Sequence, residues 1–305
     1  MSQPFEITFH DRYTEKKEVE KVYGGDAVEF AYNSFFGKLM APIIASRTVT
    51  KLYGFMQDRD ASKHKVPPFV KTFNIDMDLY EKGSFPENDI ETSYKSFNEF
   101  FIRRFKPGKR NFINGPKQMA ACAEARYFGY PEITDGLTVP VKGSMLKAVD
   151  LMADAELGAD FIGGPLMIAR LCPVDYHRYH YPDNGKTLKS YNVKGDFHSV
   201  NPLALKFRGD IFIKNERRVS ILETENFGKL AYIEVGATCV GKIIQSYDEN
   251  QDFSRGDEKG YFLFGGSTVI ICGEKGKWTP SSDMVKNTEL GIETYIHLGD
   301  EVGII

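Results

Sequence analysis

Apolar residues recur at helical spacing in the first third of the chain. One set, with its members four residues apart, is Ala27, Ala31, Phe35 and Leu39, and this spacing places side chains on one face of a helix. Pro42 suits the first turn of a second helix. The apolar residues of that second helix are Ile43, Ile44, Val49, Leu52, Phe55 and Met56. The pattern predicts a pair of amphipathic helices.

Basic residues interrupt or flank these apolar runs at Lys38, Arg47, Lys51 and Arg59. An amphipathic helix with basic residues can dock on an anionic membrane surface. The same apolar face can instead pack against the rest of the protein. The pattern alone leaves both interpretations open.

A further short helix is predicted after Ser96. Ser96-Phe97-Asn98-Glu99 has the S-x-x-E spacing of a capping box, in which serine and glutamate side chains cap the first turn. The apolar run that follows stops at Pro107-Gly108, a pair that ends helices. We therefore expect residues 1–112 to form a mainly helical region.

After Phe112 the chain changes to short runs of aromatic and β-branched residues separated by turn residues. Two such runs are 127–130 and 229–236. Turn signals arrive roughly every ten residues, which is typical of a twisted antiparallel or barrel-like β assembly. The predicted fold class is α+β, with N-terminal amphipathic helices followed by a mostly antiparallel, barrel-like β catalytic domain over residues 113–305.

Composition and charge are those of an ordinary globular protein. Of the 305 residues, 42% are hydrophobic and 27% are charged, and the formal net charge of −3 gives no support for nucleic-acid binding. The four cysteines lack C-x-x-C spacing, which favours reduced thiols in the cytosol over a zinc site or a redox pair. We find no signal-peptide pattern and no apolar run of the ~20 residues that cross a bilayer.

Near the C-terminus, glycines and hydroxyls interrupt an apolar run that otherwise predicts strand. Gly265-Gly266-Ser267-Thr268 stands where a buried strand prefers bulky side chains. A β-bulge or a turn explains the interruption without any function. Alternatively, the backbone is kept open so that the Ser267 hydroxyl can reach an adjacent carbonyl.

Two histidines lie three residues apart in the segment 175–180. His177 and His180 could supply two metal ligands, but no third ligand is evident, and we predict no metal site. They could also be ordinary histidines of a β-hairpin. A third interpretation is acid/base chemistry, because Asp175 lies beside them and could orient an imidazole.

Five short motifs follow one another between residues 173 and 269. They are Pro173-x-Asp175-Tyr-His177-Arg-x-His180, Phe197-x-Ser199-Val200-Asn201-Pro202, Asn215-Glu216-Arg217, Val235-Gly236-Ala237 and Phe264-Gly265-Gly266-Ser267-Thr268-Val269. In order and separation they resemble the phosphatidylserine decarboxylase family. The segment 96–110 is similar to that family's N-terminal signature, so the resemblance extends from there to the C-terminus.

The resemblance implies a proenzyme that cleaves its own backbone between residues 266 and 267. The Ser267 hydroxyl would attack the Gly266 carbonyl, and the resulting ester would eliminate and hydrolyse to leave a pyruvoyl group at residue 267. Serine needs a base for this step, and His180 matches the family's base. Gly265 and Gly266 place no Cβ in the path of the attack.

The pyruvoyl group derived from Ser267 is the implied cofactor. In the family it forms a Schiff base with the amine of phosphatidylserine and draws electrons as CO2 leaves, so that phosphatidylethanolamine is the product. His177 matches the family histidine that handles substrate and transfers protons. The large and small chains of one precursor would stay together as partners, and the resemblance leaves a homodimer open.

One position departs from the family pattern. The family usually has an Asp that orients the histidine base, and Glu124 stands in its place here, one methylene longer. A displaced carboxylate can slow a reaction by on the order of a hundredfold. Self-cleavage could therefore be slow, could depend on Asp175 instead, or could be lost.

Three functions remain to be compared. The first is a pyruvoyl-dependent phosphatidylserine decarboxylase that docks peripherally on the cytoplasmic face of a membrane through its N-terminal helices. The second is a decarboxylase of a soluble aromatic amino acid, as in relatives that resemble this sequence. The third is a cleavage-deficient, non-catalytic lipid-binding homologue, in which Glu124 marks the loss of maturation.

Overall fold

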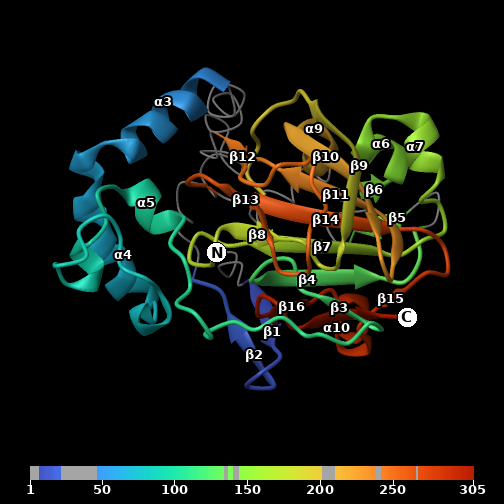
Figure 1. Cartoon of the computed structure of the whole chain (residues 1–305), viewed down its shortest axis with the longest axis horizontal. Helices are drawn as coiled ribbons and strands as arrows, with labels where there is room; N and C mark the ends of the chain where they lie inside the picture. Colours follow the sequence, from blue (N-terminus) through green and yellow to red (C-terminus); the bar gives the residue numbers. More distant parts are fainter. Residues whose placement is uncertain are drawn as a thin grey trace, which may run out of the picture.

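The computed structural model describes residues 7–21, 47–133, 137–139, 144–200, 210–237, 242–265 and 267–305. Within these ranges a group of helices lies beside a larger body of β-strands (Figure 1). This arrangement agrees with the predicted α+β class. The first predicted helix, residues 27–39, and the start of the second lie outside the described residues.

The helices beside the strands come from residues 47–101, which we call the helical lobe. Its elements are α3 (Arg47–Asp58), η1 (Asp60–Lys65), α4 (Val66–Phe73), η2 (Met77–Leu79), η3 (Ile90–Thr92) and α5 (Phe97–Phe101), where η marks a 3-10 helix. The predicted capping box is confirmed in part, because the Ser96 hydroxyl accepts a hydrogen bond from the Glu99 amide at 3.2 Å. The Glu99 side chain bonds the amide of Lys95 instead of that of Ser96.

Among the described residues, the largest sheet has nine strands. From edge to edge they are β2 (Lys16–Val19), β1 (Thr8–Asp11), β16 (Glu293–Ile296), β4 (Ala125–Tyr130), β7 (Leu166–Leu171), β14 (Ser267–Gly273), β11 (Gly228–Val235), β10 (Arg217–Thr224) and β9 (Gly185–Val193). The pair β1–β16 is parallel and the other neighbours are antiparallel. The mostly antiparallel character is therefore confirmed.

Two details differ from the expectation. The nine-stranded sheet is open, with β2 and β9 at its edges, so the structure gives no support for a barrel. In addition, residues 8–19 form a β-hairpin of this sheet, although residues 1–112 are predicted to be mainly helical. Each hairpin strand has only four residues, too few to show a clear alternation, and β1 obtains its pairing from β16 at the far end of the chain.

Smaller elements surround this sheet. The remaining strands are β12 (Ile243–Gln245), β13 (Glu258–Phe262) and β8 (Arg178–His180) in one sheet, β15 (Thr279–Pro280), β17 (Glu301–Ile304) and β3 (Gln118–Ala120) in another, and the hairpin β5 (Leu137–Val139) and β6 (Ser144–Leu146). The remaining helices are α6 (Ala148–Met152), α7 (Ala155–Ala159), α9 (Ile211–Lys214) and α10 (Ser282–Glu289). Among the described residues, no helix is long and apolar enough to cross a bilayer.

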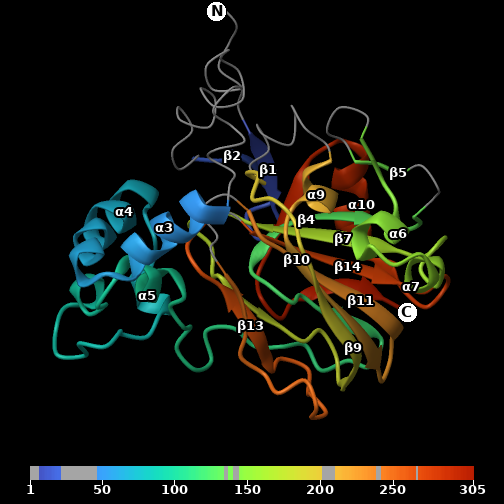
Figure 2. The same cartoon turned by 90° about the horizontal axis from the view of Figure 1, so that it is seen from above.

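The helical lobe shares its hydrophobic core with the segment that precedes Ser267. Phe264 is buried, and its ring centroid lies 4.9 Å from those of Phe97 and Phe101 and 5.9 Å from that of Tyr53. Figure 2 shows the lobe to one side of the sheet, with β13 facing it. The Gly-Gly-Ser-Thr segment therefore begins where lobe and sheet meet.

Candidate active site

Ser267 is the first residue of β14, in the middle of the nine-stranded sheet between β7 and β11. Its side chain is fully buried, at 0% exposure. Two residues earlier, Gly265 has a φ of +143°, a backbone conformation that favours glycine. Gly266, the predicted site of attack, lies outside the described residues.

His177 lies against the Ser267 side chain. Its Nδ1 is 3.2 Å from the Ser267 hydroxyl oxygen, and its Nε2 is 2.8 Å from the carbonyl oxygen of Cys172. Because a carbonyl can only accept, Nε2 must carry the ring proton, and Nδ1 of the neutral ring is then an acceptor. The serine hydroxyl therefore donates to His177.

The surroundings of His177 keep it uncharged. The ring is fully buried and stacks on Phe101 with 3.8 Å between centroids. Burial lowers the pKa of His177 to about 3, and the hydrogen bond to Cys172 only partly opposes this effect. A neutral imidazole with its lone pair directed at a serine hydroxyl has the arrangement of a general base and its nucleophile.

His180 does not occupy the position expected of the base. Its Nδ1 donates to the Gly256 carbonyl at 2.8 Å, and its Nε2 lies 3.3 Å from the Tyr176 hydroxyl. Burial lowers the pKa of His180 to about 4. Both ring nitrogens are thus engaged away from Ser267, and it is His177 that the structure brings to the serine.

The sequence suggests that the Asp175 carboxylate orients a histidine, but its hydrogen bonds go to other groups. Its carboxylate accepts from Arg126 at 2.6 Å and from the backbone amide of Cys172 at 2.7 Å. Burial raises the pKa of Asp175, and the charge of Arg126 opposes this rise. Since the Cys172 carbonyl accepts the hydrogen bond from His177 Nε2–H, Asp175 acts on His177 through the turn that begins at Cys172.

A set of buried charges lies behind this turn. The charged network, as we call it, consists of Glu20, Arg126, Arg170, Asp175 and Glu293, all at least nine-tenths buried. Arg170 bonds Glu20 at 2.7 Å and Glu293 through its Nε at 2.7 Å, and Arg126 lies 3.1 Å from Glu20. Burial opposes ionisation of Glu20, but Arg170 and Arg126 outweigh it and lower its pKa to about 2.

The sequence patterns indicate Asp175 but none of the other members of this charged network. Glu20 directly follows the hairpin, in the region that the sequence assigns to helices. A usable signal does exist in the strands, because Arg126 and Arg170 are single charges within otherwise apolar runs. Buried arginines almost always have partners, so each predicts a nearby carboxylate without saying which one.

Glu124 also has partners other than a histidine. Its carboxylate accepts two hydrogen bonds from Arg110 and one from the Tyr295 hydroxyl at 3.0 Å. The Leu298 amide lies 3.3 Å from the same carboxylate. In this structure Glu124 therefore joins the segment after the helical lobe to the C-terminal strands, and it does not orient His180.

The residues present fit a pyruvoyl group at position 267. The serine from which it would form is buried beside a neutral imidazole, which can accept its proton. The glycine at 265 supplies the unusual backbone conformation before it. Among the described residues, no group of three His, Cys, Asp or Glu side chains is placed to hold a metal ion.

Comparisons with known proteins agree with the motifs. The family model for phosphatidylserine decarboxylase matches residues 97–304. The chain is 38% identical over 299 residues to a phosphatidylserine decarboxylase proenzyme of Desulfitobacterium hafniense, covering 98% of both chains. It is 38% identical over 299 residues to that of Clostridium kluyveri, covering 98% of this chain and 99% of the relative. The chain therefore belongs to the phosphatidylserine decarboxylase family.

Proposed function

We propose that the protein is a decarboxylase that converts phosphatidylserine to phosphatidylethanolamine and CO2 after cleaving its own chain between residues 266 and 267. The relatives named as phosphatidylserine decarboxylase proenzymes support the reaction and the proenzyme state. The proposal is carried by the contact of 3.2 Å between His177 Nδ1 and the Ser267 hydroxyl, two side chains that are both fully buried.

The first stage is an acyl shift followed by elimination. His177 accepts the Ser267 proton as the oxygen attacks the Gly266 carbonyl carbon. The peptide C–N bond then breaks to give an ester, and the proton held by His177 passes to the nitrogen of residue 267, which becomes a free amino group. Loss of the α-proton of residue 267 then expels the Gly266 carboxylate and leaves a double bond at residue 267. One water molecule hydrolyses the resulting enamine, and ammonia leaves as the pyruvoyl carbonyl forms.

During turnover the pyruvoyl group supplies a carbonyl that withdraws electrons from the substrate carbon losing CO2. His177 lies at residue 267 and is placed to hold or return a proton there. The hydrogen bond from Nε2 to Cys172 fixes the ring, and the Asp175–Cys172 bond fixes the turn. Phe101 and Phe264 close the site toward the helical lobe.

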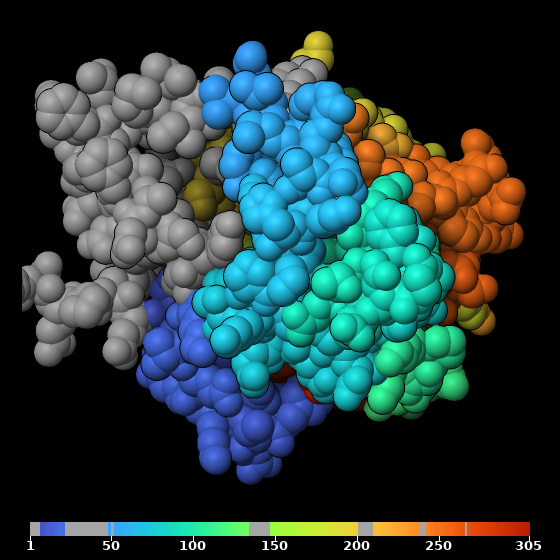
Figure 3. All heavy atoms as spheres, turned by 90° about the vertical axis from the view of Figure 1, so that its left-hand side faces the viewer, coloured from blue at the N-terminus to red at the C-terminus, as the bar shows by residue number. Residues whose placement is uncertain are grey.

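We also propose that the protein docks peripherally on the cytoplasmic face of a membrane, and the exposed side chains of helix α3 support the docking. The apolar side chains of this helix are exposed despite their size: Val49 40%, Leu52 61%, Phe55 53% and Met56 54%. Figure 3 shows α3 on the outer face of the lobe, and Arg59 lies over the Phe55 ring with 4.3 Å between them. An exposed apolar stripe with basic residues suits the surface of an anionic bilayer.

Intact mass under denaturing conditions tests the maturation step. We expect two fragments divided between Gly266 and Ser267, the smaller one carrying a pyruvoyl N-terminus, and only full-length protein from the Ser267→Ala variant. A wild-type chain that stays at 34.5 kDa would contradict the proposal and favour the non-catalytic lipid-binding homologue. Fragments from Ser267→Ala would show that the nucleophile is another residue.

CO2 release tests the substrate. We expect release from phosphatidylserine in vesicles and none from free tryptophan under the same conditions. The reverse result would assign the protein to the soluble amino-acid decarboxylases. Vesicle flotation with a Leu52→Ser/Phe55→Ser double variant tests docking, because both side chains are exposed and their loss should weaken flotation without preventing folding.

A further inference from the structure

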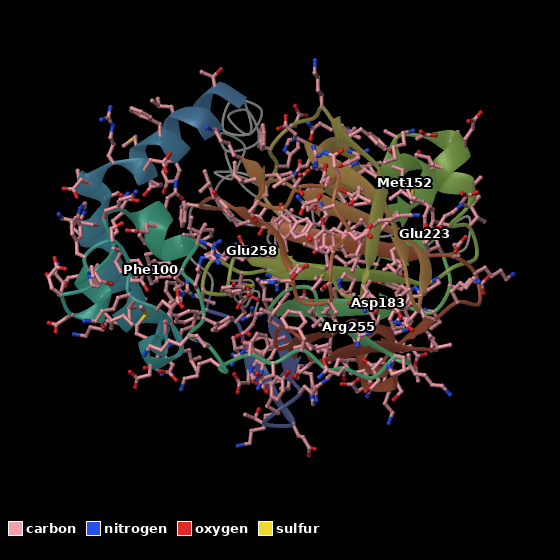
Figure 4. The ribbon with its side chains drawn as sticks, in the orientation of Figure 1. Phe100, Met152, Asp183, Glu223, Arg255 and Glu258 are labelled. Carbon is pink, nitrogen blue, oxygen red and sulfur yellow. The ribbon has the colours of Figure 1, made fainter. Side chains whose placement is uncertain are left out.

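A cleft of about 620 Å³ lies between the helical lobe and the strands that carry the site. Leu263, four residues before Ser267, is on its wall. Figure 4 shows the two sides of this junction, with Phe100 in the lobe and Glu258 toward the sheet. The cations that line the cleft are Lys82, Lys95, Arg103, Arg104 and Arg178, and the acids are Asp58, Glu81 and Glu99.

Arg103 is the unusual residue of this cleft. It is only 2% exposed, and it has no carboxylate within 4.0 Å in the described part of the chain. Its Nη2 donates to the carbonyls of Val174 at 2.7 Å and Asp175 at 3.3 Å, while its Nε has no acceptor. A buried charge without a counter-ion is costly. The cleft therefore holds a guanidinium that lacks an anion.

The neighbouring cations are also incompletely neutralised. Arg104 and Arg178 share the single carboxylate of Glu258, at 3.1 and 2.7 Å. The ammonium group of Lys95 has no acceptor among the described residues, and that of Lys82 bonds only the Pro86 carbonyl. Five cations therefore face three lining acids, and Glu258 supplies one further negative charge.

Two of those acids are already held by protein donors. The Glu99 carboxylate accepts from the hydroxyl of Ser84 at 2.5 Å, and the Asp58 carboxylate accepts from the side chain of Asn98 at 2.7 Å. The same Asn98 accepts from the Phe264 amide at 2.8 Å. These two acids thus hold the cleft walls together. Because they are bonded to Ser84 and Asn98, the cations of the cleft remain available to a ligand.

We propose that this cleft binds a phosphate group, and that a phospholipid headgroup is its source. Guanidinium groups bind phosphate oxygens through paired, charge-assisted hydrogen bonds. Arg103 donates to the Val174 carbonyl, three residues before His177, and Leu263 lies four residues before Ser267, so the cleft adjoins both chain segments that lead to the site. The assignment of the phosphate to a lipid rests on the proposed function, whereas the anion site itself does not.

Phosphate binding is measured best in the uncleaved Ser267→Ala chain, by calorimetric titration with inorganic phosphate and with glycerophosphoserine. We expect one saturable site for each. Lys95→Gln and Arg104→Gln, both at exposed positions, should each raise the dissociation constant about tenfold, the effect of losing one charge-assisted bond. Lys71→Gln, an exposed lysine of α4 outside the cleft, serves as the matched control and should change nothing.

The outcomes separate the site from its ligand source. The anion site would be overturned by the absence of saturable binding, or by dissociation constants in Lys95→Gln and Arg104→Gln equal to that in Lys71→Gln. Arg103 would then serve only as a clamp for the Val174 and Asp175 carbonyls. Competition between glycerophosphoserine and phosphatidylserine vesicles would support the lipid source. Phosphate binding without such competition would overturn the assignment of the phosphate to a lipid headgroup. Because all titrations use the Ser267→Ala chain, which lacks the proposed nucleophile, these results do not depend on whether the wild type cleaves itself.

Discussion

Two buried regions meet at the turn from Cys172 to Asp175, and they treat charge in opposite ways. On one side, Ser267 and His177 lie among aromatic rings, and burial keeps the imidazole neutral. On the other side, the charged network keeps Glu20 ionised at similar burial, because Arg170 and Arg126 lie within 3.1 Å of it. Burial alone does not decide the charge state; the neighbours do.

The difference suggests a division of labour. A neutral histidine can accept a proton from serine, which a charged one cannot. The charged network contacts no reacting group. Through Asp175 it instead fixes Cys172, on whose carbonyl the direction of the His177 ring depends. Changes in the first region should therefore affect the reaction, and changes in the second should affect stability and positioning.

The largest effect should follow from replacing His177. Removing a proton-transfer group typically costs 10²–10⁴ in rate, so we expect His177→Ala to lower CO2 release about a thousandfold. The measurement is CO2 release from phosphatidylserine vesicles per mole of protein, with circular dichroism to confirm that the variant is folded. Activity near that of the wild type would remove His177 from the reaction.

Fragment formation in His177→Ala and His180→Ala then decides which histidine accepts the Ser267 proton. The contact of 3.2 Å assigns this step to His177, whereas the family resemblance assigns it to His180. Cleavage that persists in His177→Ala and is lost in His180→Ala would give the step to His180 and restrict His177 to turnover.

The next effect in size concerns the charged network. Arg170→Met leaves Glu293 without its arginine and Glu20 with only Arg126, and breaking a buried ion pair in this way costs about 3–5 kcal/mol of the free energy of unfolding. Urea unfolding measures the loss. Lys186→Met is the control, because its pair with Glu223 is about half exposed and exposed ion pairs contribute little to stability. Equal losses of unfolding free energy in both variants would contradict the distinction between the buried charged network and an exposed ion pair.

The pH dependence of the free energy of unfolding distinguishes the region around Ser267 from the charged network, and it requires no substitution in that network. Below pH 6.5 the unfolded chain protonates His177 and His180, whose folded pKa values are about 3 and 4. Stability should therefore fall as pH falls, by about 2 kcal/mol for each histidine at pH 5. Glu20, with a folded pKa of about 2 and an unfolded value of 4.5, adds its own loss only below about pH 4.5.

Urea unfolding at pH 7 and pH 5 measures this term. His177→Asn should reduce the difference between the two pH values by about 2 kcal/mol, since an asparagine does not titrate. An unchanged difference would mean that His177 is protonated in the folded state and that the region around Ser267 is not neutral.

The smallest effect should come from Glu124→Asp. The shorter side chain cannot keep its bonds to Arg110, Tyr295 and Leu298 together, and we expect a loss of about 1–2 kcal/mol in unfolding free energy, the typical cost of one or two hydrogen bonds. The rate of fragment formation should not rise, because Glu124 is not bonded to a histidine. Faster cleavage would show that the carboxylate acts on the base after all, as the family's Asp does.

Much of the fold could be predicted because its signals are local. The capping box at Ser96 and the turn residues after Phe112 are contained within a few neighbouring residues. The N-terminal hairpin could not be predicted, because β1 pairs with β16, more than 280 residues away, and its four residues have no distinctive pattern. The open edges of the main sheet are likewise a property of pairing over long distances.

The motifs indicate which residues belong to the site better than they indicate how those residues are arranged. The motifs indicate Ser267, His177, His180 and Asp175, and the structure brings the first two into contact. Which histidine reaches the serine depends on small differences in backbone direction around β8, where the Gly256 carbonyl accepts a hydrogen bond from Nδ1–H of His180. The link from Asp175 to His177 runs through the backbone of Cys172, which no pattern of side chains can reveal.

The position of β14 has a consequence for the matured protein. A cut before Ser267 would leave residues 267–305 as a separate polypeptide whose first strand is inserted between β7 and β11, and whose β16 lies between β1 and β4. Every one of these neighbours belongs to the other polypeptide. The small chain could not leave without separating the sheet at two places, so the two chains of one molecule should not exchange with those of another unless the whole fold opens.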